Sequence, residues 1–95
     1  MNDKIISKIR QRRRQMLVHS YIYYELDTNI ISDWQWAQWA QELRQLQADY
    51  PEESKAVEVY EMFKDWDGSS GAHLSYTNAI KDTARRLLEY HGRNN

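Results

Sequence analysis

One stretch of the sequence gathers side chains that could hold a flat ligand. Residues 19–39 read HSYIYYELDTNIISDWQWAQW, with three tyrosines within four positions and three tryptophans within six. Asp33 immediately precedes the tryptophans. Aromatic faces stack on planar rings, and a carboxylate accepts hydrogen bonds from hydroxyl or amide groups. This combination is typical of a site for a small ring-bearing molecule.

Four of these residues are expected to meet across one turn. Asp33 and Trp36 are three positions apart, so they share one face of a helix. Tyr23 and Tyr24 end the preceding helix and would face them. Together the four side chains could hold an amide-bearing ring between aromatics, with Asp33 as the polar anchor. The alternative is plain core packing, since aromatics dominate small hydrophobic cores.

A second candidate site is a run of arginines near the N-terminus. Four arginines lie within residues 10–14: Arg10, Arg12, Arg13 and Arg14. They could contact phosphate or nucleic acid from a helix face. The alternative is a solvated helix end, which the sequence pI of about 6.3 favours, because nucleic-acid-binding domains are usually strongly basic.

The residues indicate no catalytic or metal-binding site. The chain has no cysteine, and the three histidines (His19, His73 and His91) lack the spacing of metal ligands. His19 and Ser20 are adjacent on a predicted helix, so their side chains do not face each other as a base and a nucleophile would. We therefore expect a binding protein and not an enzyme.

Apolar residues recur at helical spacing, and no run alternates in the manner of a strand. We expect helices near residues 3–26, 32–49, 53–64 and 77–91. The predicted fold is a small all-α single domain over residues 1–95, built on an antiparallel helical hairpin (residues 9–53), with a helix, a loop (residues 65–76) and a C-terminal helix in residues 54–95.

The start of the second helix has a clear signature. Ser32 with Gln35 forms a capping box, and Ile31 can pack against Trp36 as a hydrophobic staple. Farther along this helix the spacing predicts three residues buried against the first and last helices: Trp39, Leu43 and Leu46.

Two other helices carry less regular patterns. The apolar stripe of the first helix is interrupted at residues 12–14, so its first turns are expected to project beyond the core. The helix over 53–64 is expected to turn four residues inward: Ala56, Val59, Tyr60 and Phe63.

Charge is spread unevenly along the chain. The formal net charge is −1, but residues 1–20 hold six Lys or Arg and one acidic residue, whereas residues 21–74 hold three basic and eleven acidic residues. A basic end on an acidic body suggests two different surfaces. Neither a signal peptide nor a membrane span is expected, which predicts a cytoplasmic protein.

The hairpin motif resembles a known family. The pattern Y-x-Y-Y-x-x-D-x-x-x-I-S-D-x-x-aromatic, followed by WAQELRQLQADYPE, is similar to the N-terminal Ia domain of bacterial NAD-dependent DNA ligases. The resemblance covers about residues 9–53. It implies a helical hairpin that binds the nicotinamide mononucleotide (NMN) half of NAD. The remaining residues look more like short free-standing ligase-related proteins of phages and prophages.

The resemblance assigns roles to individual positions. Tyr23 matches an aromatic of the motif, and Tyr24 falls where the family has a His or Tyr that touches the nicotinamide nucleotide. Asp33 matches a ligand-contacting carboxylate, and Trp36 falls where the family stacks a tyrosine on the nicotinamide ring. Ala37 replaces a second ligand-contacting aspartate, so one polar contact is lost.

The expected function is therefore a non-catalytic module that binds NMN or NAD without a metal. The alternative is a phage protein-interaction module that inhibits a host protein, for example a defence nuclease, through an acidic surface. Six residues would form that surface: Glu52, Glu53, Glu58, Glu61, Asp65 and Asp67. Such a surface would suit a basic partner.

Overall fold

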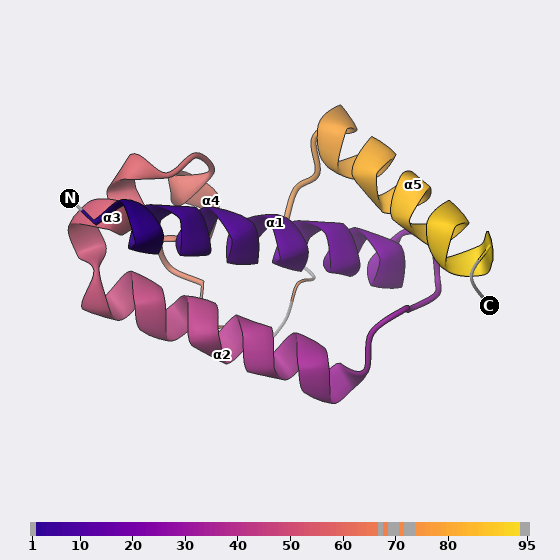
Figure 1. Cartoon of the computed structure of the whole chain (residues 1–95), viewed down its shortest axis with the longest axis horizontal. Helices are drawn as coiled ribbons and strands as arrows, with labels where there is room; N and C mark the ends of the chain where they lie inside the picture. The colour runs from indigo at the N-terminus through magenta and orange to yellow at the C-terminus, as the bar shows by residue number, and fades with distance from the viewer. Residues whose placement is uncertain (1, 67, 69–70, 72–73, 94–95) are drawn as a thin grey trace.

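The computed structural model describes residues 2–66, 68, 71 and 74–93. Within them the chain forms helices α1 (Asp3–Tyr24), α2 (Asp33–Asp49), α3 (Pro51–Ala56), α4 (Tyr60–Phe63) and α5 (Asn78–Arg93) (Figure 1). This described part contains no strand, so the predicted all-α class is confirmed. Residues 67, 69–70 and 72–73 of the predicted loop, with Asp67 and His73, lie outside it.

Helices α1 and α2 form the predicted hairpin. Figure 1 shows α2 running alongside α1 in the opposite direction, while α5 lies on the other side of α1 near its C-terminal half. At the opposite end of the hairpin, α3 packs against both α1 and α2. Since α1 contacts every other long element, it is the central helix of the fold.

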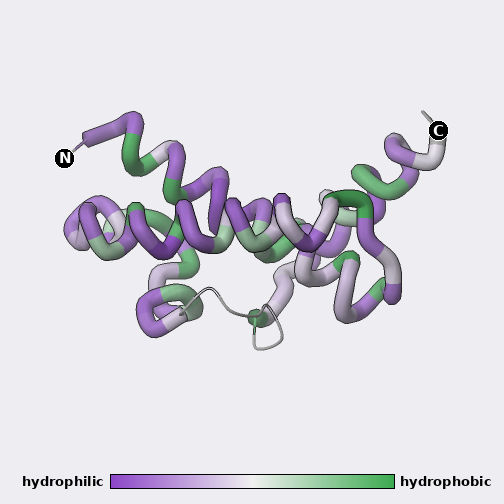
Figure 2. The backbone as a smooth tube through the Cα atoms, turned by 90° about the horizontal axis from the view of Figure 1, so that it is seen from below, coloured by the Kyte–Doolittle hydropathy of each residue, from purple (hydrophilic) through white to green (hydrophobic). Residues whose placement is uncertain are grey.

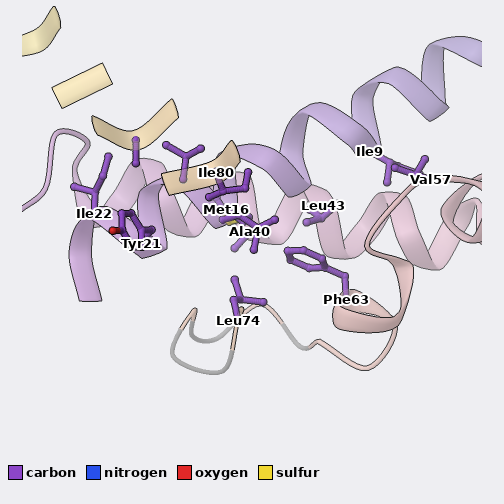
Figure 3. Close-up of a cluster of buried hydrophobic side chains, with 13 residues drawn as sticks. Ile9, Met16, Tyr21, Ile22, Ala40, Leu43, Val57, Phe63, Leu74 and Ile80 are labelled. Carbon is purple, nitrogen blue, oxygen red and sulfur yellow. The ribbon is translucent and has the colours of Figure 1, made fainter. Parts of the chain in front are cut away.

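The hydrophobic core lies along α1. Ile9 and Met16 of this helix have no exposed surface. Figure 3 shows Phe63 and Leu74, from segments that follow the hairpin, reaching toward Ala40 of α2. Residues beyond the hairpin therefore supply part of its core.

The helices combine polar and apolar residues and are not uniformly apolar. Figure 2 shows hydrophilic and hydrophobic stretches alternating along the tube. Among the residues that the structure describes, no helix combines the length and the apolar character needed to span a bilayer.

The second helix begins where its cap predicts. Ser32 is the N-cap of α2, and its Oγ accepts a hydrogen bond from the Gln35 amide at 3.0 Å. Leu43 is fully buried as expected, but the predicted burial of Trp39 and Leu46 is wrong, because both are half-buried. The reason is that α5 packs on α1 and leaves the outer side of α2 uncovered.

The expectation that the first turns of α1 project beyond the core is also wrong. Ile9 is fully buried, and Ile5 and Ile6 are partly buried against the core. The arginines do not interrupt the packed face, because Arg13 itself is buried and has no exposed surface.

The predicted continuous helix over 53–64 is wrong as well. The chain forms two short helices, α3 and α4, and between them Val59 has a φ of 62°, in the left-handed region that disfavours β-branched residues. Arg13 Nη1 donates to the carbonyls of Val57 and Glu58, at 3.1 and 3.3 Å. In a continuous helix these carbonyls would bond to the amides of residues 61 and 62.

This break changes which residues face inward. Val57 is buried, whereas Ala56, which was expected inside, is exposed. Phe63 is fully buried as predicted, while Val59 and Tyr60 are half-buried. The buried arginine therefore explains the error in this part of the fold.

Candidate functional site

A pocket of about 460 Å³ lies at the closed end of the hairpin. The last turns of α1, residues 29–32 of the connecting loop and the first turn of α2 form its walls, and Gly68 adds a contact from the segment after α4. All four residues predicted from the aromatic motif line it: Tyr23, Tyr24, Asp33 and Trp36. The structure thus brings together the side chains that the sequence singled out, and Ala37 lies beside them.

The two tyrosines form an exposed rim of the pocket. Tyr23 and Tyr24 are 51% and 46% exposed, and their rings meet edge to face at 4.9 Å between centroids. Residues so exposed do not form a core, so the core-packing interpretation is wrong for these two positions. Both rings instead lie at the mouth of the pocket, where they form part of its lining.

Trp36 is the half-buried aromatic of the pocket. Its ring meets Trp66 edge to face, with centroids 6.2 Å apart and planes at 84°. Trp36 therefore has two roles: one part of its ring packs against the protein, and another part lines the pocket.

Asp33 supplies a negative charge at the pocket. It is exposed and lies in the first turn of α2, next to the Ser32 cap. A carboxylate is favoured there because helix N-termini carry a positive partial charge. Ala37, one turn farther along, also lines the pocket but offers no polar atom in its side chain.

Among the pocket residues that were missed from the sequence are two buried polar ones. His19 and Ser20 are buried and line the pocket, and neither His19 Nδ1 nor Ser20 Oγ has a hydrogen-bond partner among the described residues. Burial lowers the pKa of His19 below its usual value of 6.5, so the neutral imidazole is favoured. Their positions four residues before Tyr23 and Tyr24 were a usable signal, because such pairs share a helix face.

The arginine run does not form one site. Arg13 is fully buried; its Nη2 donates to Ser54 Oγ at 2.7 Å and its Nε donates to Gln47 at 2.9 Å. Burial lowers the pKa of Arg13 to about 10. Arg12 pairs with Glu42 at 3.1 Å and lies over the Trp39 ring at 5.5 Å.

The other two arginines are more accessible. Arg10 pairs with Glu58 at 2.9 Å, and Arg14 is exposed. Both line an open groove between α1 and α5, and His19 lines this groove as well as the aromatic pocket. The prediction of phosphate or nucleic-acid contact therefore applies only to these two side chains.

The acidic residues of the alternative function lie mainly at the surface. Glu58 is paired with Arg10, and Glu61 is paired with Lys64 at 2.7 Å. Asp67 lies outside the described residues. In the described ranges, no three His, Cys, Asp or Glu side chains gather closely enough to hold a metal ion.

Comparison with known proteins identifies the hairpin. The family model described as "DNA ligase-like, N-terminal NAD+-binding domain" matches residues 2–56, more than half of the chain. The chain belongs to this family. The family match covers α1, the connecting loop, α2 and α3, and so contains every pocket residue except Gly68. No curated protein and no solved structure matches the chain.

Proposed function

We propose that the chain is a non-catalytic module that binds the NMN half of NAD in the pocket between α1 and α2. One observation carries the proposal: Tyr23, Tyr24, Asp33 and Trp36 come from two helices of a DNA ligase-like NAD+-binding domain and line one pocket. The volume of about 460 Å³ is in the range of small-molecule sites.

The side chains suit the chemistry of the nicotinamide ring. In its oxidised form this ring is a planar cation, which is attracted to the face of a tryptophan or tyrosine. In this proposal Trp36 stacks on one face of the ring and Tyr24 covers the other. Asp33 can accept hydrogen bonds from the ribose hydroxyls or the carboxamide, and its charge favours the cation.

The charge of the pocket predicts which nicotinamide compounds should bind well. No lysine or arginine is among the described residues that line it, and Asp33 is their only carboxylate. The phosphate of NMN is therefore expected to point toward solvent. Nicotinamide riboside, which keeps the ring and ribose but lacks the phosphate, should bind about as well as NMN. Reduced NMN, whose ring is neutral, should bind more weakly.

The test is calorimetric titration with NMN. Asp33→Asn should abolish the measured heat, while Ala37→Asp should strengthen binding about tenfold or more, because a hydrogen bond to a charged acceptor is worth about 1.5–3 kcal/mol. Asp82→Asn, an exposed carboxylate on α5, is the control and should bind like wild type. Silence of both wild type and Ala37→Asp at millimolar NMN would overturn the proposal and favour the acidic-surface interaction function.

A further inference from the structure

The pocket is supported by residues beyond the family match. The match ends at residue 56, yet Gly68 lines the pocket and two neighbouring residues, Trp66 and Gly71, pack against Trp36. The segment between α4 and α5 thus contributes to a site whose recognised residues all lie in the hairpin.

Trp66 joins the pocket to the core. Its ring meets the fully buried Phe63 edge to face at 5.2 Å and 88°, and it meets Trp36 edge to face at 6.2 Å and 84°. Edge-to-face pairs are favoured because the positive edge of one ring meets the negative face of the other. Phe63 therefore fixes Trp66, and Trp66 limits the orientations open to Trp36.

Gly71 also lies next to the Trp36 ring. A Cβ atom at this position would lie 2.1 Å from Ser20 Oγ and 3.4 Å from Trp36 Cζ2. The first distance is far below van der Waals contact, so any side chain here would push Ser20 or the backbone at residue 71 aside. The absence of a side chain allows the backbone to lie directly against two pocket residues.

We propose that Trp66 and Gly71 are positioning residues that fix the Trp36 ring and thereby set the affinity of the pocket for a nicotinamide nucleotide. The ligand part of this inference rests on the proposed function. Neither residue needs to touch the ligand, because both act through Trp36. A ring held in one orientation loses less conformational freedom when a ligand stacks on it.

The experiment combines ligand titration with the indole N–H signals of the four tryptophans in a ¹⁵N-labelled chain. Trp66→Leu should shift the Trp36 signal before any ligand is added, and should weaken NMN binding by about two- to tenfold. Trp66→Phe, which keeps an aromatic edge, should restore most of the affinity. The signal of Trp34, which is 70% exposed, serves as the internal reference.

Glycine variants provide a second, independent arm. Gly71→Ala should shift the Trp36 signal and weaken NMN binding, whereas Gly92→Ala should change neither, because a Cβ at residue 92 would meet nothing within 4 Å. A wild-type Trp36 signal and wild-type affinity in both Trp66→Leu and Gly71→Ala would overturn the inference. Silence of both wild type and Ala37→Asp toward NMN would overturn the proposed function, while the ligand-free Trp36 signal would still decide whether Trp66 and Gly71 position the ring.

Discussion

The two ends of the hairpin differ in whether their buried polar side chains find hydrogen-bond partners. At the end formed by α1 and α3, the buried Arg13 guanidinium is bonded to Gln47, Ser54 and two main-chain carbonyls. At the other end, His19 Nδ1 and Ser20 Oγ are buried without a partner among the described residues. A polar atom that the protein does not pair costs free energy, and such atoms are often found at ligand sites.

The aromatic residues at the two ends also differ, in this case in how far they are exposed to solvent. Near Arg13, Phe63 is fully buried and lies 5.8 Å from the guanidinium. At the pocket end, Tyr23 and Tyr24 are about half exposed, although they lie on α1, the same helix as Arg13. One end therefore has a hydrogen-bonded buried charge beside a buried ring, while the other has exposed rings beside buried polar atoms without a partner among the described residues. The comparison predicts which substitutions alter stability and which alter binding.

The largest effect is expected at Arg13. Arg13→Met keeps most of the aliphatic length but removes every hydrogen bond of the guanidinium, so it should lower the free energy of unfolding by about 3–5 kcal/mol. The measurement is urea denaturation followed by circular dichroism. Arg14→Met, at the exposed neighbouring position, should cost less than about 0.5 kcal/mol. Equal costs for the two variants would remove the contrast between the ends of the hairpin.

A smaller effect is expected from the helix caps, and it separates stability from binding. Ser32→Ala removes the cap of α2, and Thr77→Ala removes the bond from the Ile80 amide to Thr77 Oγ1 at the start of α5. Each should cost about 1 kcal/mol of stability in denaturant titrations. Only Ser32→Ala should also weaken NMN binding, because this cap fixes the turn that carries Asp33. Similar losses of affinity in both variants would show that the cap of α2 has no special role at the pocket.

The buried imidazole should make stability depend on pH. The pKa of His19 is lowered in the folded state, so between that lowered value and 6.5 the unfolded chain binds more protons than the folded one. Stability should therefore be highest above pH 6.5 and fall as the pH drops below it. Comparing His19→Gln with wild type from pH 7.5 to 5 isolates this contribution, with His91→Gln, at an exposed position, as control. A wild-type pH dependence in His19→Gln would assign the effect to other groups.

The smallest effect is expected at Arg10, only one helical turn from Arg13. Its ion pair with Glu58 is largely exposed, and such pairs contribute about 0–1 kcal/mol because water and salt screen the charges. Arg10→Gln should therefore change the denaturation midpoint only slightly, and the change should shrink further in high salt. If Arg10→Gln lowered the free energy of unfolding as much as Arg13→Met does, the arginines would act as one network.

Local patterns in the sequence predicted the hairpin well. The Ser32 cap, the end of α2 before Pro51 and the helical class all follow from interactions within a few residues, and the structure reproduces them. The gathering of Tyr23, Asp33 and Trp36 also followed from helix periodicity and one turn. In these cases the information lies close to the residues concerned.

The errors share a different physical cause. The break at Val57–Val59 depends on a guanidinium more than forty residues earlier in the chain. The contribution of Gly71 depends on a backbone approach to Ser20 and Trp36, which no local pattern encodes. The arginines were expected at the surface because charged side chains are rarely buried, but Arg13 has enough partners to offset its desolvation.

The break between α3 and α4 also has an evolutionary consequence. Arg13 and the left-handed backbone at Val59 support each other, since the break presents the carbonyls that the guanidinium bonds and the guanidinium satisfies the carbonyls that the break exposes. Neither feature is favourable alone, so we infer that changes at positions 13 and 59 are epistatic. A double-mutant cycle between Arg13→Met and Val59→Gly should be non-additive, and additive costs would contradict the inference. Position 13 lies inside the family match and position 59 lies beyond it, so this coupling would tie the hairpin to the segment that follows it.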